Sequence, residues 1–446
     1  MSPSHDELVQ LNRDNVLFSW SRQGSVNPVA LDRAEGVHIW DANGKRYFDF
    51  SSQLMCSNLG HGHPRVVKAI QEQVGKFQFF HPGYAHEPKG RLAAELLSIT
   101  PGDMGKVFFT LGGAEANENA IKIARMATGR HKVLSRYRSY HGATAGAATL
   151  SGDPRRFAAE PGIPGVVHFH GPYTYRSPFG ADTDAEECAR ALHHLEQTVQ
   201  FEGPETIAAV FLEGTNGSSG LLVYPEGYMA GVRSLCDRHG ILLVIDEVMS
   251  GFGRTGEWFG YSHFGIDADI VTMAKGLTSA YLPLGAVVVS QALANHFDDN
   301  PLVCGLTYSG HPVSCSAALA VIETYREENI LEKVRALAPV QDRLLAQMKD
   351  RHPSVGEVRN VGLFGVIECV RNRQTREPMT PWNAKPDQME ATNRLAGALR
   401  ERGLMTFVRW SWLFCVPPLI ITEAQLEEAF QIIDDALSVA DEYTTN

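Results

Sequence analysis

Short runs of apolar residues alternate with segments of helical spacing along much of the chain, and this alternation limits the possible folds most. Residues 207–212 and 241–245 are apolar at every position. Further strand-sized runs occupy residues 106–110, 132–134, 269–273 and 284–289. Helical patterns such as 228–239, which ends before Gly240, separate several of them. Continuous apolar strands between helices are typical of a mainly parallel sheet covered on both faces, so the sequence predicts an α/β fold.

The two ends of the chain differ from this central pattern. Residues 1–65 are rich in predicted strands and turns. The C-terminal part contains long helical patterns at 330–349, 389–402 and 423–440, around short strands near 357–368 and 404–416. We therefore expect a large domain over residues 66–325 and a smaller α+β domain built from residues 1–65 and 326–446.

The charge balance excludes some classes of partner. The 446 residues include 40 Lys and Arg against 51 Asp and Glu, which gives a formal net charge of −11. Phosphate recognition needs a clustered basic face, and none is visible in the sequence. No run approaches the roughly 20 apolar residues that span a bilayer, and residues 1–7 lack the pattern of a secretory signal. We expect neither a nucleic acid nor a membrane as partner.

The seven cysteines are spread singly from Cys56 to Cys415. An odd set without paired spacing fits neither a disulfide framework nor a CxxC metal site, so we expect no metal. Free thiols are typical of a reducing cytoplasm. With 44% apolar and 20% charged residues, the chain has the composition of an ordinary globular protein. These features predict a cytoplasmic enzyme.

Polar side chains follow several of the predicted strands. Glu213 comes after 207–212, Asp246 after 241–245, and Lys275 after 269–274. The pair Tyr140-His141 and the turn Gly112-Gly113-Ala114 follow two other strands. In a parallel sheet, ligands bind in the crevice at the carboxyl ends of the strands. The sequence therefore predicts that these residues form one site.

The residue types at this predicted site match the needs of pyridoxal phosphate. Gly113 and Ala114 open a helix, where free backbone N–H groups favour an anion, although an ordinary tight turn has the same pattern. Lys275 lies among apolar residues, which lower a lysine's pKa and free its amine for covalent chemistry; a solvated loop lysine is the commoner alternative. Asp246 could keep a pyridinium nitrogen protonated or could cap a helix. Tyr140 would supply an aromatic surface.

Residues 251–256 fit the GxGxxG pattern and raise the alternative of an NAD-dependent oxidoreductase. That fingerprint requires its glycines to lie in the turn that opens a helix. Here residues 246–250 separate the glycines from the strand, and the aromatic, glycine-broken segment 257–265 follows them. We therefore interpret 251–256 as a glycine-rich active-site loop, and the oxidoreductase hypothesis rests on this motif alone.

Six ordered motifs resemble those of class III aminotransferases. They occupy residues 113–118 with 122–125, 140–142, 246–248, 251–256, 274–276 and 307–312. The resemblance extends from about residue 32 to 436. It implies a pyridoxal-phosphate-dependent transferase of fold type I, with a mainly parallel sheet of the seven-stranded type and a smaller α+β domain. It also implies transfer of an amino group to a 2-oxo acid.

The resemblance assigns roles around the cofactor ring. It implies that Lys275 bonds covalently to pyridoxal phosphate and later acts as general base. Asp246 would be the partner of the pyridine nitrogen. Val248 and Tyr140 would pack on opposite faces of the ring, with His141 beside Tyr140.

The resemblance also assigns the phosphate contacts. Backbone N–H groups of Gly113 and Ala114 would bind the phosphate, and Thr307 would reach the phosphate of a neighbouring subunit, which implies a homodimer. The sequence departs from the family pattern at two places. Ala114 stands where a Ser or Thr is usual, so one hydroxyl contact is missing, and Glu213-Gly214 stands where Glu-Pro is usual.

Arg409 resembles the arginine that binds the carboxylate of the oxo acid in many class III members, and Glu213 resembles its gating carboxylate. An arginine fork binds a carboxylate bidentately, and a nearby glutamate could hold it aside for another substrate. The alternative is a surface ion pair. Trp20 and Met55 should form the opposite wall of the pocket, where Met55 could also be core filler.

The wider pattern is most similar to the taurine branch of the ω-amino acid enzymes. This implies taurine as the first donor candidate, then β-alanine or 4-aminobutyrate, with 2-oxoglutarate or pyruvate as acceptor. Extra positive charge for a sulfonate or carboxylate could come from Arg138, Arg155 and Arg156, for which surface salt bridges are the alternative. Two other activities of related enzymes stay open: a lyase acting on amino-alcohol phosphates, and a broad ω-amine:pyruvate transaminase.

Overall fold

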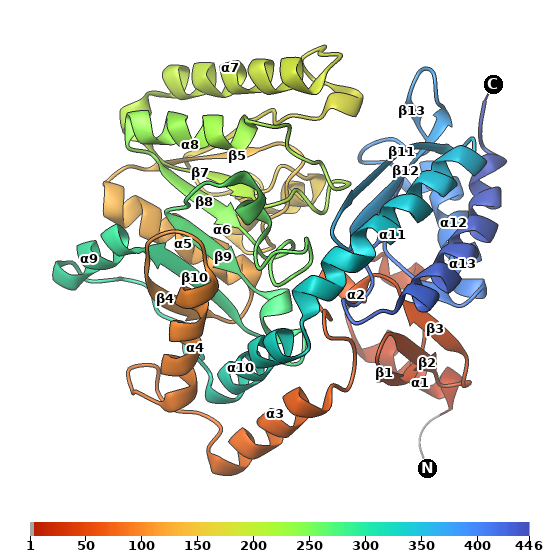
Figure 1. Cartoon of the computed structure of the whole chain (residues 1–446), viewed down its shortest axis with the longest axis horizontal. Coiled ribbons are helices and arrows are strands. Elements are labelled where there is room, and N and C mark those ends of the chain that lie inside the picture. The colour runs from red at the N-terminus through yellow and green to blue at the C-terminus, as the bar shows by residue number, and fades with distance from the viewer. Residues whose placement is uncertain (1–3, 446) are drawn as a thin grey trace.

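The computed structural model describes residues 4–445 and has the predicted α/β architecture (Figure 1). Residues 1–3 and 446 lie outside this range, so the prediction that residues 1–7 are not a secretory signal falls partly outside the described residues. Within the described range, no helix combines the length and apolarity that crossing a membrane requires.

A seven-stranded sheet forms the centre of the large part of the molecule, in the order β4-β10-β9-β8-β7-β5-β6. Only β10 is antiparallel to its neighbours, β4 and β9. The strands are β4 (Met104–Thr110), β5 (Lys132–Arg136), β6 (Val166–Phe169), β7 (Ile207–Glu213), β8 (Leu242–Asp246), β9 (Ile270–Met273) and β10 (Gly285–Ser290). All the predicted central strands are confirmed, and β6 is an additional edge strand. Three of its four residues are only partly buried, and His168 interrupts its apolar run, so it lacks the continuous apolar pattern that identified the others.

Helices cover both faces of this sheet, because alternate strand residues point to opposite sides. Val244 of β8 packs in one cluster with Ala120 of α5, whereas Leu243 and Ile245 pack in another with Val232 of α8. The helices of this part are α3 (Pro64–Lys76), α4 (Glu87–Ile99), α5 (Gly113–Thr128), α6 (Ala145–Leu150), α7 (Asp184–Glu202), α8 (Tyr228–His239), α9 (Gln291–Asp299) and α10 (Pro312–Glu327).

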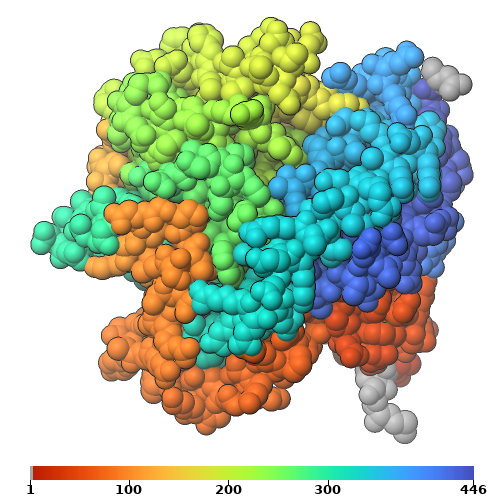
Figure 2. All heavy atoms as spheres, in the orientation of Figure 1, coloured from red at the N-terminus to blue at the C-terminus, as the bar shows by residue number. Residues whose placement is uncertain are grey.

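The two ends of the chain fold together at the other side of the molecule, as Figures 1 and 2 show by the contact of the red and blue segments. A four-stranded sheet joins β1 (Leu31–Glu35), β2 (His38–Asp41) and β3 (Arg46–Asp49) to β14 (Leu404–Met405). A second sheet contains β11 (Val355–Val361), β12 (Phe364–Asn372), β13 (Glu377–Pro378), β15 (Val408–Arg409) and β16 (Trp412–Cys415). The helices are α1 (His5–Asn15), α2 (Ser52–Met55), α11 (Ile330–Arg351), α12 (Glu390–Glu401) and α13 (Glu423–Asp441). The domain boundaries at 65 and 325 remain predictions.

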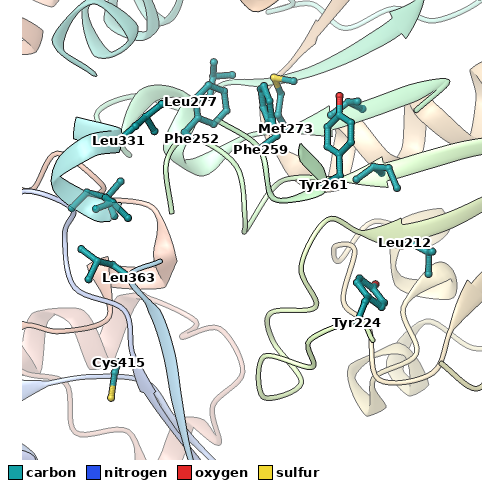
Figure 3. Packing of buried hydrophobic residues seen from close by; sticks show 14 of the residues in the cluster. Leu212, Tyr224, Phe252, Phe259, Tyr261, Met273, Leu277, Leu331, Leu363 and Cys415 are labelled. Carbon is teal, nitrogen blue, oxygen red and sulfur yellow. The ribbon is translucent and has the colours of Figure 1, made fainter. Parts of the chain in front are cut away.

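One apolar cluster continues from the central sheet into the C-terminal part. Figure 3 shows Leu331 of α11 beside Phe252 and Leu277, with Leu363 and Cys415 of the C-terminal segment in the same cluster. All five side chains are buried. Because this core is continuous, the loops that follow β8 and β9 are fixed against the segments that carry β15 and β16.

A buried ion cluster adds a polar connection between the two parts. The carboxylate of Glu368 in β12 is 1% exposed and accepts hydrogen bonds from Tyr173 Oη at 2.6 Å, Arg176 Nε at 2.8 Å and Arg359 Nη2 at 2.6 Å. Tyr173 and Arg176 follow β6 of the central sheet. Burial raises the pKa of Glu368, but the two arginines outweigh it and lower this pKa to about 2.

Glu368→Gln should lower the free energy of unfolding by about 3 kcal/mol at neutral pH, because it leaves two buried guanidinium groups without their counter-charge. The carboxylate's contribution is complete above its ordinary pKa of 4.5 and is lost as the pH falls toward 2. The difference in the free energy of unfolding between wild type and variant should therefore shrink by about 1.4 kcal/mol for each pH unit below 4.5. Denaturant unfolding at several pH values measures this, and a difference independent of pH would contradict the assignment.

Candidate active site

A cavity of about 750 Å³ opens at the carboxyl ends of the central strands. Its walls bring together residues that are far apart in the sequence, as the sequence predicted. The predicted site residues that line it are Trp20, Met55, Gly113, Ala114, Tyr140, His141, Glu213, Asp246, Val248, Lys275 and Arg409. Thr307 is the exception, because it lines a second cavity of about 800 Å³ with Lys89 and Phe109.

Lys275 follows β9 after a single residue, Ala274, and begins a short 3₁₀ turn, Lys275–Thr278. Its backbone is in the left-handed region with φ of 47°, which is unfavourable for a residue with a Cβ and is found most often at functional sites. Burial lowers the pKa of Lys275 below its ordinary value, and the nearby Cys56 and Asp246 only partly oppose this. The side chain therefore presents an amine that gives up its proton more readily than a solvated lysine.

Asp246 ends β8 and is held by three neighbours. Its Oδ2 accepts a hydrogen bond from Asn117 Nδ2 at 2.7 Å and lies 2.8 Å from His141 Nδ1. Its Oδ1 accepts one from the backbone N–H of Val248 at 2.9 Å. Asn117 is fixed in turn by the hydroxyl of Thr272 at 2.8 Å. Sequence reasoning did not single out Asn117 as a site residue, although it lies within the motif 113–118.

The first turn of α5 faces the cavity with the features that favour an anion. Its N-cap, Gly112, has an extended backbone and makes no side-chain capping bond within the described chain, so the first N–H groups stay available for a ligand. A Cβ added at Gly113 would lie 2.7 Å from Val248 Cγ1. The glycine thus allows Val248 to pack directly against the start of α5.

Glu213 lies deep in the cavity wall at the end of β7. Its Oε1 accepts a hydrogen bond from the backbone N–H of Tyr140 at 3.1 Å, and its Oε2 accepts one from Asn216 Nδ2. Burial raises the pKa of Glu213 to about 7. The expected pairing of Glu213 with Arg409 is absent among the ion pairs of the described residues, where Arg409 Nη2 instead contacts Asp153 Oδ2 at 2.8 Å.

Of the three additional arginines, Arg155 lines the cavity. Its guanidinium carbon lies 3.5 Å from the centroid of the Tyr140 ring, and its Nε donates to Asp153 Oδ1 at 2.9 Å. The other two lie elsewhere: Arg138 is stacked over Trp382, and Arg156 is paired with Glu160. The sequence suggested all three equally, because it does not tell which side chain enters the cavity.

Trp20 and Met55, both with positive φ, also line the cavity. Met55 is 4% exposed and packs in a small cluster with Trp412 and Phe414. Trp20 is 65% exposed and lies over Arg155 at 5.8 Å. Met55 therefore both packs in the core and lines the cavity, so the two alternatives, core filler and pocket wall, apply together.

Residues 251–256 form successive turns and do not open a helix. Arg254 is fully buried and donates to the backbone oxygens of Leu363 and Pro417, while its Nη2 donates to Ser52 Oγ and Asn58 Oδ1. This loop therefore joins the N-terminal and C-terminal segments. It lacks the helix-opening glycine turn that a dinucleotide site requires.

The residues around the cavity fit pyridoxal phosphate. A lysine amine can bond to the cofactor's reactive carbonyl, and a buried carboxylate can pair with its ring nitrogen. An aromatic side chain can pack on the face of the cofactor ring, and free N–H groups at a helix N-terminus can bind its phosphate. In the range 4–445, no group of three or more side chains could hold a metal ion.

Comparison with known proteins agrees with this geometry. The family described as aminotransferase class III matches residues 20–437. The chain is a class III aminotransferase. Enzymes of this class depend on pyridoxal phosphate, so the cofactor predicted from the site is confirmed.

Several relatives of this class III aminotransferase have a named substrate. It is 36% identical to gamma-aminobutyrate transaminase 1, mitochondrial, of Oryza sativa subsp. japonica, over 94% of this chain and 82% of the relative. It is 35% identical to taurine–pyruvate aminotransferase of Bilophila wadsworthia, over 98% of both chains. A solved structure of taurine:2-oxoglutarate aminotransferase from Bifidobacterium kashiwanohense, in complex with pyridoxal phosphate and glutamate, is 44% identical over 100% of both chains, with a TM-score of 0.96.

Proposed function

We propose that this aminotransferase moves the terminal amino group of an ω-amino acid to a 2-oxo acid. Taurine is the first candidate donor, followed by β-alanine and 4-aminobutyrate, and 2-oxoglutarate precedes pyruvate as acceptor. The named substrates of the three relatives support this choice. The observation that carries the proposal is the pair of guanidinium groups, Arg155 and Arg409, in the wall of the cavity that also contains Lys275.

Lys275 and Asp246 would perform the central chemistry. When bound, pyridoxal phosphate supplies an electron sink that makes the proton on the amine-bearing carbon removable. The Nζ of Lys275 would hold the cofactor covalently and would also be the base that takes that proton. Its lowered pKa favours the neutral amine that this step needs. Asp246 would hold a proton on the ring nitrogen, with its orientation fixed by His141 and Asn117.

The other cavity residues would orient the cofactor. Tyr140 and Val248 would pack on opposite faces of its ring, and the backbone N–H groups of Gly113 and Ala114 would bind its phosphate. Thr307 lies outside this cavity, which agrees with a contribution to the phosphate site of a second subunit. We therefore propose a homodimer as the active form.

Arg409 would bind the carboxylate of the 2-oxo acid. Its Nη1 is buried and has no hydrogen-bond partner in the described part of the chain, so this terminal nitrogen still needs an acceptor, which a substrate carboxylate would supply. Arg155, stacked on Tyr140, would add positive charge for the sulfonate or distal carboxylate of an ω-amino acid. Trp20, which lies beside Arg155, and Met55 would limit the space for the substrate, and Glu213 would support the backbone of Tyr140.

A donor panel with two acceptors tests this proposal. Taurine, β-alanine, 4-aminobutyrate, ornithine and 1-phenylethylamine are each assayed with 2-oxoglutarate and with pyruvate. We expect the highest kcat/KM for an ω-amino acid with an anionic end group, because two guanidinium groups line the cavity. Preference for 1-phenylethylamine with pyruvate would instead indicate a broad ω-amine transaminase.

A further inference from the structure

Asp153 lies behind the cavity wall, in contact with Arg155 and Arg409, which line the cavity. Its side chain is 0% exposed. Its Oδ1 accepts hydrogen bonds from the backbone N–H and the Nε of Arg155, both at 2.9 Å. Its Oδ2 accepts from Arg155 Nη2 at 3.2 Å and pairs with Arg409 Nη2 at 2.8 Å. One carboxylate thus faces two guanidinium groups, so the cluster has an excess positive charge of one.

Both arginines of this cluster are held in fixed planes. Arg155 stacks on Tyr140 at 3.5 Å, and Arg409 stacks on Trp410 at 4.2 Å. Asp153 occupies Nη2 of Arg409, whereas Nη1 is left without a partner among residues 4–445. A substrate carboxylate that binds both prongs of Arg409 must therefore compete with Asp153 for Nη2.

Glu213 is less suited than Asp153 to pair with Arg409 and compete with a substrate carboxylate. Both of its carboxylate oxygens are engaged, by the backbone of Tyr140 and by Asn216. Burial raises the pKa of Glu213 to about 7, so near neutral pH much of it has no charge. Asp153 differs: burial raises its pKa, but Arg409 and Arg155 outweigh burial and keep it below the ordinary value. Asp153 is therefore the anion that is present beside Arg409.

We propose that Asp153 is a positioning residue that determines specificity: it holds Arg409 while the amine donor occupies the cavity, and it yields Nη2 to the carboxylate of the 2-oxo acid. This inference rests on the proposed function. An ω-amino acid has no carboxylate on its reacting carbon, so Arg409 would face it as an unpaired, desolvated charge if Asp153 were neutral. Asp153 thus favours binding of the amine donor and opposes binding of the 2-oxo acid.

Asp153→Asn in the holoenzyme tests the proposal. The asparagine oxygen can still accept the backbone N–H of Arg155, so the start of the 3₁₀ turn Pro154–Ala159 is preserved. We expect kcat/KM for 2-oxoglutarate to rise about 10-fold and kcat/KM for taurine to fall about 10-fold, a change of about 1.4 kcal/mol each. A merely structural role would lower both. Equal losses for both substrates would therefore overturn the proposal.

Two further variants make the test sharper. Asp153→Ser also removes the charge and keeps a capping oxygen, so it should shift the two substrates in the same opposite directions. Glu213→Gln is the matched comparison, and it should leave the ratio of the two kcat/KM values near that of wild type. If Glu213→Gln produces the opposed shifts and Asp153→Asn does not, Glu213 is the gating carboxylate.

A double-mutant cycle with Arg409→Met tests whether Asp153 acts through Arg409. Arg409→Met alone should lower kcat/KM for 2-oxoglutarate more than that for taurine; the reverse order would overturn the proposal. In the Arg409→Met background, Asp153→Asn should change kcat/KM for 2-oxoglutarate by less than about two-fold. If Asp153→Asn still raises kcat/KM for 2-oxoglutarate about 10-fold when Arg409 is absent, the proposal is also overturned. A wild-type enzyme inactive with every ω-amino donor contradicts the proposed function itself, whereas active wild type with unshifted variants contradicts only this inference.

Discussion

Lys275→Ala should lower turnover by about 10³-fold and should remove the absorbance of the lysine-bonded cofactor from the spectrum of the purified enzyme, while the protein stays folded. The loss combines the missing covalent attachment with the missing general base, for which 10²–10⁴-fold is typical. The side chain of Lys275 lines the cavity and is not part of the apolar core clusters, so stability should change little. Absorbance spectra and steady-state rates measure the two effects.

Lys106→Ala is a suitable control for this experiment. Lys106 lies on β4 with 61% of its side chain exposed, and it pairs with Asp298 away from the cavity. This variant should keep both the absorbance and the rate of wild type. Near-normal turnover of Lys275→Ala, with Lys106→Ala unchanged, would contradict the assignment of the lysine.

Asp246→Asn should lower kcat by about 10²–10³-fold, the range typical of removing one preorganised electrostatic group from an active site. Asparagine preserves the shape of the side chain and can still accept the N–H of Val248, but it cannot supply the negative charge that holds a proton on the ring nitrogen. The cofactor should remain bound through Lys275. Rates and cofactor content, measured on the same preparation, separate loss of chemistry from loss of cofactor.

The same substitution at the other end of the sheet provides the control. Asp269 precedes β9, where it accepts the backbone N–H of Leu243 and pairs with Arg233. Asp269→Asn should reduce stability and leave kcat unchanged. If both variants lose activity to the same extent, the effect of Asp246→Asn comes from the fold and not from the cofactor ring.

Most of the fold, and the gathering of the main candidate site residues around one cavity, were predictable from sequence for a common physical reason. Buried parallel strands such as β7 and β8 require continuous apolar residues, and the chain must leave each strand at the same edge of the sheet. The residues after these strands, Glu213 and Asp246, consequently meet in one cavity. The apolar runs predict the strands, and the position of Glu213 and Asp246 just after two of them predicts that both lie at the same edge of the sheet.

The ion pairs of the cavity were not predictable in the same way. Arg409 comes from β15 in the C-terminal part, whereas Asp153 precedes a 3₁₀ turn after α6. Their contact depends on how two separate parts of the chain pack, and no local pattern encodes it. The resemblance to known enzymes indicated Glu213 as the partner of Arg409, and here the contact is made by Asp153. Asn117 was missed because its role depends on the orientation of one side chain toward Asp246.

The most direct measurement of the central claim is a half-reaction with holoenzyme and taurine in the absence of any 2-oxo acid. Amino transfer predicts the release of a single equivalent of aldehyde per active site, a change in the cofactor's absorbance, and then no further reaction until 2-oxoglutarate is added. The added acceptor should restore the original spectrum and yield glutamate. Continued product formation from an amine without any acceptor would contradict the account, because it would identify the enzyme as a lyase.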